Sequence, residues 1–132
     1  MVGLVGNVLM ILAGLMFAHW VGDFVLQNDE MATNKSKSMK ALLTHTGVYS
    51  VVMWFTAQMM LEFNVFGAQY WWAAILFGLI QFISHTIIDY VTSRMNAYYW
   101  VNEQRHNFFT NIGFGQYLHF LVLIISLYAI FY

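Results

Sequence analysis

The sequence predicts an all-α protein built as a four-helix transmembrane bundle. Of its 132 residues, 61% are hydrophobic and only 8% are charged, whereas about 25% of an average soluble domain is charged. Four apolar segments are long enough to cross a bilayer, which takes about 20 helical residues, and polar connections separate them. Because open backbone is not viable in lipid, each segment is expected to be a helix. Residues 1–132 are expected to form a single integral membrane domain.

The four predicted helices cover approximately 2–27, 41–61, 70–92 and 108–131. The first lacks the basic start of a signal peptide, and its apolar run is too long for one, so we interpret it as a retained helix. The first and third connections are long enough to contain short surface helices. His106, in the third connection, is expected at the surface.

Composition excludes several other classes of protein. The formal net charge is −1, which argues against nucleic acid as a partner. The chain has no cysteine, so disulfides and thiolate metal sites are excluded. It also has no proline, so no helix is expected to be kinked by one.

The basic residues predict an orientation in the membrane. All five lie in the first and third connections, and the second connection has none. The positive-inside rule then places the first and third connections in the cytoplasm of a bacterium and both termini in the periplasm, across the inner membrane. The five residues are Lys35, Lys37, Lys40, Arg94 and Arg105.

Six polar residues are expected at membrane depth. An HxxxD pair occurs near the end of the first predicted helix and again near the end of the third, and the second and fourth helices each add a histidine. This correspondence predicts two pseudo-repeated helical hairpins. A charge inside a bilayer costs roughly 3 kcal/mol, and the helix rise places all six groups roughly 7–16 Å deep, so a shared reason is expected. The six residues are His19, Asp23, His45, His85, Asp89 and His119.

Metal coordination is the explanation that these six residues favour. Histidine nitrogen and aspartate oxygen suit zinc, which we expect first, and also iron, manganese or nickel. The six groups can form two half-sites with three ligands each, which would leave positions open for water, and two ions about 3.5–4 Å apart would clamp a phosphoryl group. If only one ion binds, an aspartate that is not a ligand, Asp23 or Asp89, is the candidate catalytic base.

Further polar residues are expected around this cluster. Lys35, Lys40 and Arg94 would surround its cytoplasmic mouth and could attract anionic headgroups or a phosphorylated substrate. Gln27 and Gln116 would lie near the site and orient ligands by hydrogen bonding. The basic rim also follows from the positive-inside rule without any ligand, so both interpretations stay open.

The strings AHWVGDFVLQND, THTGVY, SHTIIDY and GQYLHF carry a resemblance over most of the chain. The sequence resembles an uncharacterised family of small integral membrane proteins from bacteria and their phages, a domain of unknown function. The family pattern is HxxxDFxxQ, a downstream lysine, a histidine at the head of the second helix, HxxID and DQxxH. The residues that fit are His19, Asp23, Phe24, Gln27, Lys35, His45, His85, Ile88, Asp89, Gln116 and His119.

Two positions depart from the family pattern. Gly115 stands where the family has an aspartate, so one potential ligand is absent. The lysine that the family carries shortly after the third-helix aspartate has no equivalent here, and Arg94 is the nearest base. Both departures imply a reduced site.

The family pattern is also distantly similar to that of membrane-bound metal-dependent hydrolases, an analogy that does not establish function. From the polar cluster we expect a membrane-embedded metal-binding protein. The analogy adds the expectation of a hydrolase that acts on a lipid-soluble or phosphorylated substrate from the cytoplasmic leaflet. Membrane lipid is the expected partner, and homo-oligomers stay open. The alternatives are a small transporter or proton relay, a phage or host membrane interaction protein without catalysis, and a haem protein.

Overall fold

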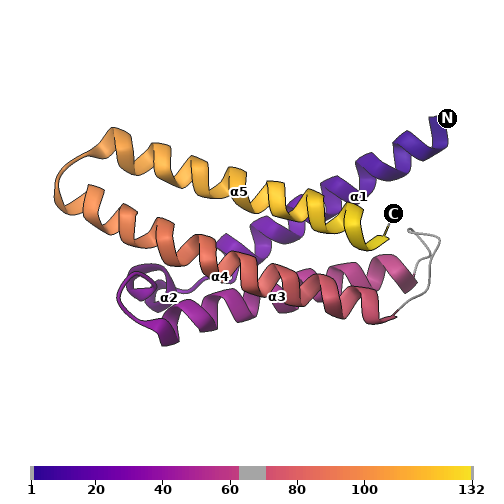
Figure 1. Cartoon of the computed structure of the whole chain (residues 1–132), viewed down its shortest axis with the longest axis horizontal. Coiled ribbons are helices and arrows are strands. Elements are labelled where there is room, and N and C mark those ends of the chain that lie inside the picture. Colours follow the sequence, from indigo (N-terminus) through magenta and orange to yellow (C-terminus); the bar gives the residue numbers. More distant parts are fainter. Residues whose placement is uncertain (1, 63–70, 132) are drawn as a thin grey trace.

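The computed structural model describes residues 2–62 and 71–131, with side chains from residue 9 onward (Figure 1). Over these residues the protein is helical and has no strand, which confirms the predicted all-α class. Most of the predicted second connection lies outside the described residues. The elements are α1 (Val2–Trp20), the π-helix η1 (Val21–Val25), α2 (Asp29–Asn34), α3 (Met39–Glu62), α4 (Trp71–Val101) and α5 (Arg105–Phe131).

The first predicted helix is not one regular helix. α1 passes into η1, and a short segment then leads to α2, a surface helix in the first connection. Asn28 begins α2, because its side-chain oxygen accepts a hydrogen bond from the Met31 backbone N–H at 2.9 Å, which satisfies one unpaired donor of the helix start. Single π-turns are rare and occur frequently at functional sites.

The predicted end of the third helix at residue 92 is too early. α4 continues to Val101, and only residues 102–104 separate it from α5. Residues 93–101 contain neither glycine nor proline, so nothing local stops the helix. The chain turns at Glu103, whose φ of 58° is the left-handed conformation that commonly ends helices. His106 lies in α5 and is exposed, as expected.

The helices pack as a row with one crossing member. α3, α4 and α5 follow one another in alternating directions, α4 contacts both neighbours, and α1 and η1 pack against α3 (Figure 1). α3 and α4 approach closely at Gly78, where a Cβ would lie 2.7 Å from the Trp54 Cβ. α2 and the α4–α5 turn lie at one end of the molecule, called the α2 end below, and both termini lie at the other (Figure 1).

The interior changes character along the bundle. The half toward the termini is filled by a buried apolar cluster that includes Leu15, Met53, Phe77 and Leu123. Beyond this cluster, toward the α2 end, most of the buried side chains are polar, and they include four histidines and two aspartates. The apolar cluster therefore closes the polar half on the side of the termini.

The outer surface carries the large apolar side chains that a water-soluble bundle would bury. Phe17, Leu79, Ile83 and Ile125 are all more than half exposed, and exposed apolar surface of this extent is typical of a protein or membrane contact. Among the described helices, α4 and α5 are long and apolar enough to cross a membrane. Both observations support association with a membrane.

Candidate metal centre

Four buried donor groups converge in the polar half. Asp23 comes from η1, His45 from α3, and His85 and Asp89 from α4. One donor atom of each lies within 4.8 Å of the donor atoms of the other three, so the group could hold a metal ion. Among the described residues this is the only such group, so the two separate half-sites are not seen.

The distances between the four donors suit one small ion. His45 Nε2 lies 3.3 Å from His85 Nε2, 3.1 Å from Asp23 Oδ1 and 3.3 Å from Asp89 Oδ2. His85 Nε2 lies 3.3 Å from Asp23 Oδ1 and 3.6 Å from Asp89 Oδ2. Ligands about 2.0–2.1 Å from a tetrahedral ion are about 3.3–3.4 Å apart. Five of the six distances between the four donor atoms are therefore close to those around a tetrahedral ion.

The electrostatics of the group also favour a cation. Two carboxylate oxygens and two imidazole nitrogens, all able to act as acceptors, face one point in a water-poor interior. The outer Nδ1 atoms of His45 and His85 are buried and have no hydrogen-bond partner among the described residues. A ligating histidine usually donates from its outer nitrogen to a protein group, whereas these two rings are held by packing on the outer side and by their Nε2 contacts on the inner side. The His85 ring stacks on His119 and lies against Tyr49, with centroid distances of 3.9 Å to each.

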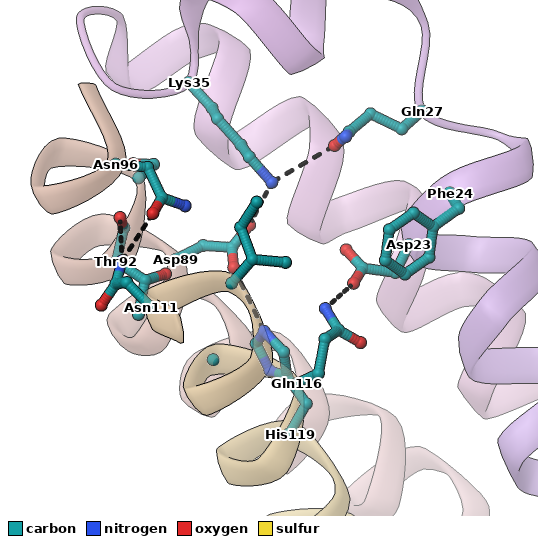
Figure 2. A pocket seen from close by; sticks show the side chains of 13 residues that line it. Asp23, Phe24, Gln27, Lys35, Asp89, Thr92, Asn96, Asn111, Gln116 and His119 are labelled. Atoms are coloured by element: carbon teal, nitrogen blue, oxygen red, sulfur yellow. Dashed lines mark hydrogen bonds and ion pairs between the residues drawn. The ribbon is translucent and has the colours of Figure 1, made fainter. Parts of the chain in front are cut away.

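The second oxygen of each aspartate is held by α5. Gln116 Nε2 donates to Asp23 Oδ2 at 2.8 Å, and His119 Nε2 donates to Asp89 Oδ1 at 3.2 Å (Figure 2). Such outer hydrogen bonds orient carboxylate ligands and raise metal affinity. His119, a predicted ligand, thus contacts a ligand instead of the central point.

His19, another predicted ligand, is also engaged outside the centre. Its Nε2 donates to Gln116 Oε1 at 2.8 Å, and its Nδ1 lies 3.0 Å from the Tyr49 hydroxyl. Its Nε2 is 3.7 Å from Asp23 Oδ2, the oxygen that faces away from His45. Both His19 nitrogens therefore have other partners, and His19 supports Asp23 through Gln116.

The predicted rim residues divide into two groups. Lys35 reaches the centre itself, where Nζ donates to Asp89 Oδ2 at 2.8 Å and to Gln27 Oε1 at 3.2 Å (Figure 2). Lys40 and Arg94 do not line the cavity beside the two aspartates, which is described in the next paragraph. Arg94 instead folds onto Tyr90, donating to its backbone carbonyl at 2.8 Å and stacking on its ring.

A cavity of about 170 Å³ opens beside the two aspartates (Figure 2). Asn111, on its wall, donates to the Thr92 carbonyl at 3.0 Å and to Asn96 Oδ1 at 2.7 Å. Sequence reasoning assigned no role to this wall. Its signal was nevertheless present, because Thr92 and Asn96 follow Asp89 at helical spacing on one face of α4. The lining residues are Asp23, Phe24, Gln27, Lys35, Asp89, Thr92, Ser93, Asn96, Asn111, Ile112, Gly115, Gln116 and His119.

Comparison with known proteins agrees with the expected family. Residues 11–132 match the family described as "Protein of unknown function (DUF3307)", so the chain belongs to this family. No curated protein matches the chain, and no solved structure does.

Proposed function

We propose that this DUF3307 protein is a membrane-embedded metal-binding protein that holds one divalent ion, zinc in the first place, between Asp23, His45, His85 and Asp89. The observation that carries this proposal is the near-tetrahedral spacing of the four donor atoms. Two imidazoles and two carboxylates are ligands that zinc accepts, and iron and manganese accept them as well. Two carboxylates also balance the charge of a divalent ion, which lowers the cost of its burial.

We further propose that the chain spans the inner membrane of a bacterium four times, with both termini in the periplasm. The exposed apolar side chains and buried polar ones support this arrangement. All five basic residues come from segments near the α2 end, which the positive-inside rule assigns to the cytoplasm. Reporter fusions after Glu62 and at Tyr132 should read periplasmic, and a fusion near Lys37 should read cytoplasmic.

The proposed reaction is hydrolysis of a lipid-soluble or phosphorylated substrate. The four side chains would hold the ion, and if the ion accepted water as a further ligand it would acidify that water and stabilise negative charge on the reacting group. Asp23 and Asp89 are both ligands in this proposal, and Asp89 also accepts a hydrogen bond from Lys35 on its inner oxygen, so neither is the unligated base that was expected. His119 holds the outer oxygen of Asp89, and the Lys35 ammonium is placed to neutralise an anion that enters the cavity.

A proton relay is the second candidate, because all six His and Asp side chains lie in one connected network of contacts no longer than 3.7 Å. A relay must, however, reach both sides of a membrane. The apolar cluster around Leu15, Met53, Phe77 and Leu123 separates the network from the end that carries the termini. This separation favours a metal centre over a relay.

Elemental analysis tests the metal proposal directly. Untagged full-length protein, purified in mild detergent without chelator, should contain about one zinc or other transition metal per chain. The double variant His45→Ala/His85→Ala should contain none, and His106→Ala, which changes an exposed histidine, should keep the wild-type content. A metal-free wild-type protein that also fails to take up added zinc, iron, manganese or nickel would contradict the proposal.

A further inference from the structure

A second cavity lies next to the first at the α2 end. It has a volume of about 470 Å³ and lies between α2 and the facing ends of α4 and α5. Three residues, Lys35, Ser93 and Asn96, line both cavities. They therefore lie between the outer cavity and the cavity beside the two aspartates, and we call these three residues the throat.

Ser93 gives this throat an unsatisfied hydrogen-bonding group. The residue is only 7% exposed, and within the part of the chain that the structure describes its hydroxyl has no hydrogen-bond partner. Serine in a helix commonly bonds to the carbonyl one turn earlier, as Ser84 does with the Ile80 carbonyl at 2.7 Å. A buried hydroxyl without a partner costs about 1–3 kcal/mol, and the Ser93 hydroxyl is available to donate a hydrogen bond to a ligand in the throat.

The charges around the throat select an anion. Lys35 lies in the throat and Lys37 lines the outer cavity, and none of the described residues that line this cavity is acidic. With a divalent ion bound, the two aspartates are balanced and the Lys35 ammonium leaves a net charge of +1. Asn96 uses its side-chain oxygen to accept from Asn111, and among the described residues its NH₂ group makes no hydrogen bond, so it can donate to an anion.

The outer cavity continues the throat with an apolar wall. Trp100 and Phe108 form part of it and pack against each other with ring centroids 5.1 Å apart. Ala97 and Val101 extend this wall. An inorganic anion would leave these side chains uncovered, whereas an alkyl chain attached to the anion would bury them.

We propose that the two cavities together bind a phosphorylated amphiphile. Its phosphoryl group lies in the throat against Lys35, Ser93 and Asn96, and its chain lies along Trp100 and Phe108. This inference rests on the proposed function, because the bound ion supplies the charge that allows an anion to approach two carboxylates. The substrate class of the metal centre is then a lipid-like phosphate ester.

Three probes separate the phosphoryl group from the chain. Decylphosphonate carries both and cannot be hydrolysed as an ester, methylphosphonate carries only the anion, and decanol carries only the chain. Calorimetric titration of the zinc-loaded, full-length protein in lipid nanodiscs should give decylphosphonate an affinity at least tenfold above either of the others. Equal binding of methylphosphonate and decylphosphonate would overturn the amphiphile and point to a free anion. A decanol affinity equal to that of decylphosphonate would overturn the anion site.

Variants then locate the site. Ser93→Ala should weaken decylphosphonate binding about tenfold, since it removes a hydrogen bond to a charged group, with no loss of thermal stability because the hydroxyl has no partner to lose. Lys37→Gln should weaken binding about threefold, as expected for an exposed ion pair. Lys40→Gln makes the same charge change outside both cavities and should leave binding unchanged.

The metal content of each variant separates the two proposals. Wild-type affinity in Ser93→Ala with zinc still bound would overturn the amphiphile site and leave the metal centre standing. Failure of the wild-type protein to bind metal, with decylphosphonate binding unaffected by chelator, would overturn the proposed function and also the charge argument of this inference. Equal losses of decylphosphonate affinity in Lys37→Gln and Lys40→Gln would assign the effect to general surface charge. They would overturn the proposal that the anion binds in the throat.

Discussion

The two helical hairpins carry the same polar motif and use it differently. His19 and Asp23 in the first correspond to His85 and Asp89 in the second, and His45 corresponds to His119. In the second hairpin the HxxxD histidine faces the donor centre, whereas in the first hairpin it is the later histidine, His45, that does so. The centre is therefore assembled across the hairpins and not within either of them.

The neighbours of each histidine explain the difference. Tyr49, one turn after His45, provides the hydroxyl that contacts His19, and its counterpart one turn after His119 is Leu123, which provides none. Gln116, one turn before His119, holds both His19 and Asp23, and its counterpart before His45 is the apolar Leu42.

The backbone differs between the hairpins as well. Asp23 lies in a π-helix, and Asp89 lies in the regular helix α4. The residue before each aspartate is Gly22 in the first hairpin and Ile88 in the second. At Gly22 a Cβ would lie 3.0 Å from Tyr49 Cδ2 and 3.3 Å from Tyr49 Cα, so η1 approaches α3 where a larger residue would not fit. A repeated motif thus identifies residues that belong together, while their partners decide each role.

The largest expected effect comes from replacing each of the two HxxxD histidines with alanine. His85→Ala removes a proposed ligand and should weaken zinc binding more than 100-fold, while His19→Ala removes only an outer support and should cost about tenfold. Competition with a chelating dye in detergent measures both affinities. Equal losses in the two variants would restore the symmetric pair of half-sites and refute the crossed arrangement.

Two glycine substitutions test the difference in backbone between the hairpins. Gly22→Ala should lower the free energy of unfolding by about 1 kcal/mol, because overpacking against Tyr49 outweighs the gain of replacing glycine in a helix. Gly47→Ala, with no neighbour within 4 Å of the new Cβ, should raise it by about 0.5–1 kcal/mol. Thermal unfolding in detergent with chelator compares them free of metal effects. Stabilisation by both would show that η1 does not need its close approach.

Lys35 tests the contribution of the first connection to the second hairpin. Its ammonium competes with an ion for Asp89 Oδ2, so Lys35→Met should strengthen zinc binding about tenfold through lost repulsion. Lys40→Met is the control and should change the affinity little. Dye competition at low ionic strength measures both. Weaker zinc binding in Lys35→Met would mean that the lysine orients Asp89 more than it repels the ion.

Tyr49→Phe should have the smallest effect on zinc binding. It removes the hydroxyl that orients His19, keeps the ring against His85, and should lower the free energy of unfolding by about 1 kcal/mol. The same variant should weaken zinc binding only a few-fold. Thermal unfolding and dye competition on one preparation report both values. A loss as large as that of His85→Ala would make Tyr49 part of the centre.

The sequence by itself predicted the helical class and which polar residues belong together. Hydrophobic segment length and the cost of buried charge act through local composition and spacing, so both can be read from a linear chain. The pairs His19–Asp23 and His85–Asp89 were recognisable for that reason. Gln27, Lys35 and Gln116 were likewise identified as neighbours of the cluster from their helical spacing and their place at its mouth.

Only the tertiary structure decided which histidines face the centre, that Lys35 reaches Asp89, and that Ser93 lies unpaired in a throat. Each of these depends on contacts between segments far apart in the chain, such as His19 with Gln116 and Lys35 with Asp89. Spacing along one helix defines a face but not what lies opposite it. The length of α4 also escaped prediction, because a polar composition after residue 92 is compatible with a loop or with an exposed helix, and packing against α5 selects the helix.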